Sequence, residues 1–355
     1  MILYNPSIAL NMGDYGISIP IHADKNKTIY DALKTGVLKN IPETLWLRGP
    51  EFFAEIVRDD LLRVHSPDYV ERLFSSVVDK EVIEAYELAI PSSEGKRWDP
   101  LKQSRPLKDF LMQSLISAGG TYTCALTALE LNTVKHTGFA FFLGGGSHHA
   151  QRSAGKGFCL INDLVVSLRK LQYEGRIRTA WIVDTDAHKG DGTAVLTWGD
   201  ASIRTLSIHM ERGWPLDEPG YDPKAIYDPS VFADFNPSYT PNDIDIGIPE
   251  GGDADYVPCL AGGLSRLEKL LSKPDIALVV CGVDPYEKDE LASSKHLQLT
   301  KETLFERDML VYNFLQERHI PSAWVTAGGY GARSWEIYVN FLEHIMPERI
   351  AEGYK

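Results

Sequence analysis

The amino-acid sequence predicts an α/β protein, a three-layer αβα sandwich around a central, mostly parallel β-sheet. Three observations predict this fold. Short apolar runs have the character of strands buried on both faces, and helical patterns lie between them. The chain has 355 residues, of which 44% are hydrophobic, so it can bury a sizeable core. Because it contains no internal repeat or low-complexity tract, residues 1–355 are expected to form one domain.

Each expected element follows from its local pattern. The strands are the apolar runs Phe139–Leu143, Ala180–Val183, Thr205–Ile208, Ile276–Val280 and Ala323–Val325. The helical patterns are Ser114–Leu131, Asn162–Tyr173 and Lys301–Glu317. The tract Pro91–Pro106 is rich in proline, serine and charge, and it predicts a long surface loop.

Composition narrows the class of protein. The formal net charge is −13, which argues against a nucleic-acid partner and suits either a positively charged substrate or simple solubility. The four cysteines form no CxxC pair, so reduced thiols are expected. The N-terminus lacks a signal-peptide pattern, and no apolar run reaches the roughly 18 residues of a membrane span. A cytoplasmic protein that does not enter the membrane is expected.

Polar segments follow four of the expected strands directly. They are Gly144–His149, Asp184–His188, Cys281–Asp284 and Thr326–Tyr330. Ligands of parallel sheets bind beyond the carboxyl ends of the strands. These four segments are therefore expected to meet at one pocket.

Asp186, His188 and Asp284 are a candidate set of metal ligands within these segments. Three protein ligands that leave a position for water or substrate are the pattern of a catalytic zinc site. Two oxygens and one nitrogen would also hold iron(II) or cobalt(II). Any one of these residues alone would be read as a helix cap or a packed polar residue.

Two adjacent histidines and a tyrosine complete the candidate machinery. His148 and His149 follow three glycines, and histidine is the usual general base near neutral pH. Asp184 and Asp191 are candidates for the acid that orients such a base. Tyr330, after two glycines, could donate a hydrogen bond to an oxyanion.

These motifs together resemble the classical zinc-dependent histone deacetylase family. The strings GGGSHHA, GFCLIND, VDTDAHKGDGT, CGVDPYEKDELA and AGGYG stand in the family's order, and LLRVHSPDYVERL extends the resemblance toward the N-terminus. It covers most of the chain, from about Tyr4 to Glu343. It implies the arginase/deacetylase fold, one zinc ion per chain and hydrolysis of the acetyl amide of N-acetyl-lysine or of a related acylated amine.

The resemblance also implies roles for individual residues. Asp186, His188 and Asp284 match the zinc ligands, and Tyr330 matches the tyrosine that polarises the substrate carbonyl. His149 matches the general base, with Asp184 paired to His148 and Asp191 paired to His149. The acyl-lysine tunnel would include Phe158, Trp214, Gly157 and Leu291. A structural potassium ion would lie near Asp184, Asp186, His188, Ser207 and Ile208.

Four positions depart from the family pattern. Lys189 replaces a second histidine, and Trp214 replaces the commoner phenylalanine of the tunnel. The rim aspartate that holds a substrate backbone falls at about Ser104, with Asp99 nearby but displaced. The glutamate of polyamine-specific members falls at Leu291, which argues against that specificity, although Asp289 and Glu290 are its neighbours.

Three alternatives differ in class or substrate. An acetylpolyamine or other small-molecule amidohydrolase would use the same core. A ureohydrolase-like binuclear enzyme would need further carboxylates where Gly190 and Tyr286 stand. A non-catalytic acyl-lysine binding protein would not need His149 and Tyr330, which are both present. The sequence does not fix the oligomeric state or the acyl-chain preference.

Overall fold

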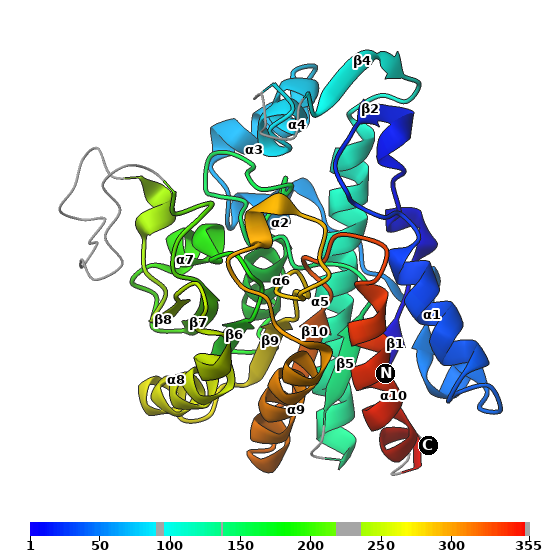
Figure 1. Ribbon diagram of the computed structural model, residues 1–355, viewed down its shortest axis with the longest axis vertical. Helices are drawn as coiled ribbons and strands as arrows, with labels where there is room; N and C mark the ends of the chain where they lie inside the picture. The colour runs from blue at the N-terminus through cyan, green and yellow to red at the C-terminus, as the bar shows by residue number, and fades with distance from the viewer. Residues whose placement is uncertain (90–95, 136–137, 218–235, 352–355) are drawn as a thin grey trace.

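The centre of the protein is an eight-stranded sheet in which every neighbouring pair of strands runs parallel (Figure 1). The computed structural model describes residues 1–89, 96–135, 138–217 and 236–351. In spatial order the strands are β3 (Leu47–Arg48), β1 (Ile2–Leu3), β5 (Phe139–Phe142), β10 (Ser322–Val325), β9 (Ile276–Val280), β6 (Ala180–Asp184), β7 (Ile203–Met210) and β8 (Ile244–Ile248).

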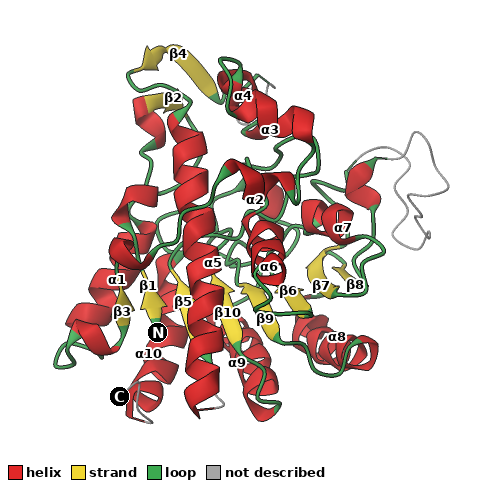
Figure 2. Cartoon of the chain, turned by 180° about the vertical axis from the view of Figure 1, so that it is seen from behind, coloured by secondary structure: helices red, strands yellow, loops and turns green. Residues whose placement is uncertain are grey.

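Helices cover both faces of this sheet, and Figures 1 and 2 show the two faces in turn. One face packs against α5 (Asp109–Lys135) and α6 (Asp163–Tyr173), with α2 (Arg58–Leu62), α3 (Pro67–Leu73) and α4 (Val78–Ala85) contributing to the same core. The other face packs against α1 (Lys25–Thr35), α8 (Tyr256–Leu270), α9 (Lys301–Glu317) and α10 (Trp335–Ala351). A short helix, α7 (Asp191–Thr197), follows β6. The predicted three-layer αβα sandwich is confirmed.

The strands read as continuous apolar runs because alternate side chains enter two different cores. In β10, Ala323 and Val325 face the α5–α6 core, whereas Trp324 faces the core on the other side. In β9, Leu278 faces the first core and Val279 the second. Both faces are buried, so neither set of positions is polar.

Two of the helices begin at side chains that the sequence provides for capping. The Asn162 Oδ1 atom accepts the amide of Val165 at 3.0 Å, and the Thr300 Oγ1 atom accepts the amide of Thr303 at 3.2 Å. Each side chain satisfies a backbone donor that the first turn leaves without an intrahelical partner. Helices α6 and α9 therefore begin where the pattern predicts.

The five predicted strands and three predicted helices are all present. The structure extends β7 at both ends, and α5 is longer than the predicted Ser114–Leu131. It also adds β1, β3 and β8, which the sequence pattern did not indicate.

The interpretation of Pro91–Pro106 as a loop was wrong for its second half. Residues 91–95 lie outside the described part, but Trp98–Gln103 form β4, which pairs antiparallel with β2 (Tyr15–Ile17). The Trp98 indole also donates to the Tyr15 carbonyl at 3.1 Å. The strand escaped notice because none of its residues is buried and it contains Pro100, so it has neither an apolar run nor an alternation.

All four cysteines lie within the described residues and are free, as the composition predicted. Among the described helices, none has both the length and the apolar character needed to cross a bilayer.

We expect Phe141→Ala to lower the free energy of unfolding by about 3–5 kcal/mol, because it empties a fully buried position. The Phe141 ring packs on Trp324, Tyr338 and Phe341 at centroid distances of 6.4, 6.2 and 6.5 Å. Urea denaturation would measure the loss. Leu101→Ala is the control, because Leu101 is 95% exposed and should change stability by about 0.5 kcal/mol or less. Equal effects of the two substitutions would contradict the core assignment.

Candidate active site

The polar segments that follow β5, β10, β9 and β6 meet because these strands are neighbours in the sheet. His148 and His149 follow β5, Tyr330 follows β10, Asp284 follows β9, and His188 follows β6. The carboxyl ends of parallel strands lie at one edge, so side chains distant in sequence face one point.

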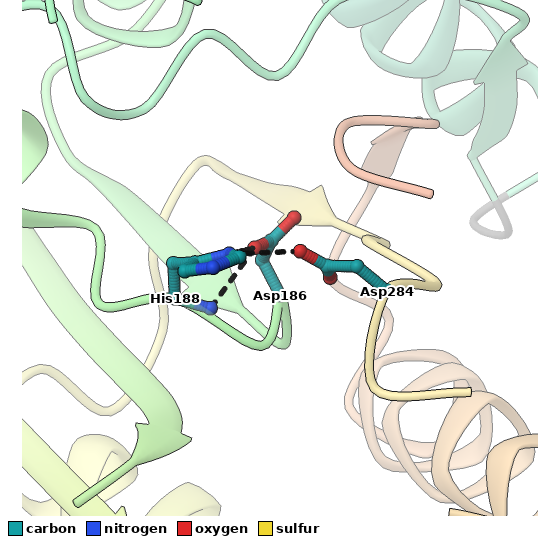
Figure 3. A group of neighbouring side chains, drawn as sticks. All are labelled: Asp186, His188 and Asp284. Atoms are coloured by element: carbon teal, nitrogen blue, oxygen red, sulfur yellow. Dashed lines mark hydrogen bonds and ion pairs between the residues drawn. The ribbon is translucent and has the colours of Figure 1, made fainter. Parts of the chain in front are cut away.

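Asp186, His188 and Asp284 form the centre of this site (Figure 3). The His188 Nδ1 atom lies 2.9 Å from Asp284 Oδ2 and 3.3 Å from Asp186 Oδ1. One ligand atom from each residue falls within 4.8 Å of the other two, and all three side chains are buried. Within the described residues, this is the cluster of three that brings His, Cys, Asp or Glu atoms close enough to hold an ion.

The electrostatics of the three residues favour a cation between them. Burial and the charge of Asp186 raise the pKa of Asp284 to about 6. Burial alone would lower the pKa of His188, but hydrogen bonds to the two carboxylates and their negative charge raise it to about 10. Two carboxylates and an imidazole nitrogen suit a divalent transition-metal ion such as zinc.

Backbone groups hold the two carboxylates in place. The Ala187 amide donates to Asp284 Oδ1 at 2.9 Å, and the Gly328 amide donates to Asp186 Oδ2 at 3.0 Å. A Cβ atom at Gly282 or at Gly328 would lie only 2.1 or 2.3 Å from Asp186 Oδ2. Glycine is required at both positions because the carboxylate occupies that space.

A buried guanidinium connects the two strands that carry the ligands. Arg307 of α9 is fully buried, and its Nη1 atom donates to the carbonyls of Thr185 at 3.1 Å and Gly282 at 2.6 Å. Its Nε atom donates to Asp308 at 2.8 Å. Thr185 precedes Asp186, and Gly282 lies two residues before Asp284, so one side chain fixes the backbone beside both carboxylates.

Each of the tandem histidines is paired with its own carboxylate. The Nδ1 atom of His148 lies 2.7 Å from Asp184 Oδ2, and that of His149 lies 2.7 Å from Asp191 Oδ1. A carboxylate accepts a hydrogen bond, so in each pair the imidazole Nδ1–H donates and Nε2 is left for chemistry. These are the pairings that the family resemblance implies.

The surroundings of the two histidines shift their pKa values in opposite directions. Burial and the positive charge of His148 lower the pKa of His149 to about 3. Burial opposes protonation of His148 as well, but Asp184 and Asp186 outweigh it and raise the pKa to about 9. Two titratable groups whose pKa values are pushed apart are suited to separate base and acid roles.

Tyr330 is held as a protonated phenol beside the cluster. Burial and the charges of Asp284 and Asp186 raise its pKa well above the ordinary value. Its backbone amide donates to Asp289 Oδ2 at 2.7 Å. The pKa of Asp289 is itself raised to about 7 by burial and by the charge of Asp284.

A pocket opens onto these groups. Its lining includes His148, His149, Asp186, Tyr330 and the tunnel candidates Gly157 and Phe158. Trp214 lies beside it, with its ring 4.6 Å from that of His149 and nearly perpendicular to it. Leu291 does not line the pocket; it is buried, and its amide donates to Asp289 Oδ1 at 2.9 Å.

The other residues that the sequence singled out near the metal ligands lie on β6 and β7 or in the segment that follows β6. Asp184 and Ser207 are register partners across β6 and β7, and the Ser207 hydroxyl accepts the Gly190 amide at 3.3 Å. Ile208 is buried one residue further along β7. Lys189 is buried, with its ammonium 2.9 Å from Asp245 Oδ2.

The two candidates for the rim aspartate position, Ser104 and Asp99, make hydrogen bonds to nearby backbone groups. The Ser104 hydroxyl donates to the Asp14 carbonyl at 3.0 Å. Asp99 lies on β4, where its carboxylate accepts the Leu101 amide at 3.1 Å.

Sequence reasoning missed several residues that support the site. Asp163 accepts the amides of Gly146 and Ser147 at 3.0 and 2.7 Å and so fixes the segment before the histidines. The Lys25 ammonium donates to the carbonyls of Ala327 and Gly329 at 3.3 and 3.2 Å. Asp163 ends the motif GFCLIND and could have been noticed, whereas Lys25 has no local signal.

Comparison with known proteins assigns the chain to a family. A sequence profile of the histone deacetylase domain matches residues 19–342. An uncharacterized protein of Picosynechococcus is 32% identical over 285 residues, which cover 79% of each chain. The acetoin utilization protein AcuC of Staphylococcus aureus is 28% identical over 83% of this chain and 70% of its own, and histone deacetylase 2 of Arabidopsis thaliana is 26% identical over 82% and 66%.

Solved structures agree in fold. A histone deacetylase homologue crystallised with SAHA superposes with a TM-score of 0.66 at 21% identity and covers 97% of this chain and 83% of its own. A homologue from Aquifex aeolicus gives a TM-score of 0.65 at 20% identity with the same coverage. The chain therefore belongs to the histone deacetylase family and is a deacetylase that hydrolyses acetyl amides.

Proposed function

We propose that this protein is a zinc-dependent deacylase that removes the acetyl group from N-acetyl-lysine, or from a related acylated amine, within one catalytic domain spanning residues 1–355. The observation that carries the proposal is the buried Asp186–His188–Asp284 cluster beside the carboxylate-paired His149, with Asp186 and His149 both lining one pocket. One zinc ion per chain would be held by these three residues, with iron(II) or cobalt(II) as substitutes. The four free thiols support a reducing compartment such as the cytoplasm.

Zinc held by Asp186, His188 and Asp284 would supply Lewis acidity, which would polarise the amide carbonyl and lower the pKa of the attacking water. The neutral His149 takes the proton of that water at Nε2, while Asp191 holds the other ring nitrogen. The Tyr330 phenol donates a hydrogen bond to the oxygen that becomes negative. His148, whose pKa is raised to about 9, would return a proton to the leaving amine.

The tunnel and a second ion complete the proposal. Gly157, Phe158 and Trp214 would wall the acyl-lysine side chain, and the bulkier Trp214 would narrow that passage. Leu291 is left out of this wall, because it does not line the pocket and its amide donates to Asp289. A structural potassium ion would be held near Asp184, Asp186, His188, Ser207 and Ile208, and it would stiffen the backbone between β6 and β7.

Alternatives in other classes receive less support from the site. A binuclear ureohydrolase would need a second set of carboxylates beside the first, and Gly190 and Tyr286 stand at those positions. A binding protein would have no use for two carboxylate-paired histidines. A small-molecule amidohydrolase shares the whole core and differs only in substrate.

Turnover of acyl-lysine peptides tests the proposal directly. Zinc-loaded protein would be given fluorogenic acetyl-, trifluoroacetyl- and longer acyl-lysine peptides, beside acetylated polyamines, with and without a hydroxamate. Hydroxamate-sensitive release of acetate from the lysine peptides is expected. Turnover of the polyamines alone would move the substrate to small amines, and inactivity on every compound would overturn the deacylase proposal.

We expect Asp284→Ala to weaken zinc binding roughly 100-fold or more, because it removes one of three ligands as well as a carboxylate that favours the cation. Competition with a chromophoric chelator would measure the affinity. Glu287→Ala is the matched control, since Glu287 is an exposed acid in the same segment. Zinc affinity that is unchanged in the Asp284 variant would remove this residue from the ligand set.

Tyr330→Phe should keep zinc and lower kcat by roughly 10²-fold, because only the phenol oxygen is lost. Steady-state kinetics on acetyl-lysine peptide and the zinc content of the purified variant would be measured together. A variant with full zinc and wild-type kcat would exclude Tyr330 from oxyanion stabilisation.

A further inference from the structure

Lys156 begins the tight turn that carries the wall residue Phe158. The Cys159 amide donates to the Lys156 carbonyl, and the Lys156 amide donates to the Cys159 carbonyl, both at 2.9 Å. The two central residues, Gly157 and Phe158, have φ angles of 56° and 66°. A non-glycine residue in this left-handed region persists only when the surrounding contacts fix it, so the turn depends on its anchors.

The Lys156 side chain reaches from this turn to the base machinery. Its ammonium lies 3.2 Å from Asp191 Oδ2 and also donates to the Ser238 hydroxyl. The other oxygen of Asp191 is the one that accepts from His149. Asp191 is completely buried, whereas the Lys156 side chain is 28% exposed, so this ion pair is largely shielded from solvent.

The same ammonium also faces the opposite wall of the tunnel. It lies 5.3 Å from the centroid of the Trp214 ring, within the range of a cation–π contact. The ring packs directly on the turn, because a Cβ atom at Gly157 would lie 2.3 Å from Trp214 Cη2. Trp214 in turn packs edge-on against His149.

Lys156 therefore links three parts of the site that the reaction needs in register. Its backbone closes the turn bearing Phe158, and its ammonium faces the ring of Trp214 and pairs with the acid that orients His149. If Lys156 only neutralised Asp191, its position in the turn and its contact with the Trp214 ring would not be required. The Gln151 side chain already donates to the same Asp191 oxygen at 3.1 Å, so that oxygen has a second donor.

We propose that Lys156 is a positioning residue for the deacylation reaction: it holds His149, through Asp191, in register with the Phe158 and Trp214 walls of the substrate tunnel. The inference rests on the proposed function. The contact with Asp191 acts on kcat, because it orients the base. The contact of the ammonium with Trp214 acts on KM, because that ring shapes the passage for the amine-bearing chain.

Lys156→Met tests this with the aliphatic stem retained and the charge removed. Both a lower kcat and a higher KM for acetyl-lysine peptide are expected, with kcat/KM reduced about tenfold or more and zinc content unchanged. Lys156→Arg should recover most of kcat, because a guanidinium can still pair with Asp191. In a Trp214→Leu background, Lys156→Met should change KM less, because the ring contact is already gone.

Lys170→Met is the matched control. Lys170 also pairs with a buried carboxylate, Asp60, at 3.0 Å and lies 5.5 Å from the ring of Tyr122, away from the pocket lining. Thermal unfolding should show a similar loss of stability in the two methionine variants, while only the Lys156 variant loses kcat.

The outcomes separate this inference from the proposed function. An active wild type together with an equally active, zinc-loaded Lys156→Met variant would overturn the role of Lys156 alone. A loss of kcat that Lys156→Arg does not recover, accompanied by a loss of zinc, would reduce Lys156 to a purely structural residue. A zinc-loaded wild type inactive on every acylated amine would overturn the proposed function and this inference with it.

Discussion

Two buried carboxylates converge on one imidazole, and the surrounding groups offset the electrostatic cost of that arrangement. Asp186 and Asp284 are each about 1% exposed, and both lie within hydrogen-bonding distance of His188 Nδ1. Like charges so close in a site of low dielectric constant are costly unless donors or a cation compensate them. The amides of Ala187 and Gly328 provide part of that compensation. A cation bound between the two carboxylates would relieve the same cost.

The neighbouring histidines follow from the same electrostatics. His148 lies 3.8 Å from Asp186 and 2.7 Å from Asp184, and against the effect of burial the two carboxylates raise its pKa. Burial and the charge of His148 lower the pKa of His149, which has one carboxylate partner. Their rings lie only 3.9 Å apart, yet their surroundings shift the two pKa values in opposite directions. Two neighbouring imidazoles are thus suited to different roles in proton transfer.

How far the sequence predicts this protein depends on the kind of signal each residue carries. Strands such as Ile276–Val280 are evident because burial on both faces leaves a continuous apolar run. The two-residue strands β1 and β3 are too short to leave a pattern, and β4 has no buried residue. Candidate ligands could be inferred because parallel strands place their ends together. The roles of Lys156 and Arg307 could not be inferred, since the role of a cationic side chain depends on partners that only the fold brings near it.

The guanidinium of Arg307 has a consequence for the order in which the site is built. It joins the carbonyls of Thr185 and Gly282, yet it lies 122 positions beyond the first of them. During synthesis, a chain that ends before α9 would already contain Asp186, His188 and Asp284 but would lack the group that fixes their backbones. The candidate ion site is therefore completed only when α9, which begins at Lys301, has docked. A metal that binds only the native state stabilises that state by mass action. The ion would therefore stabilise the completely folded chain and not the folding intermediates that lack α9.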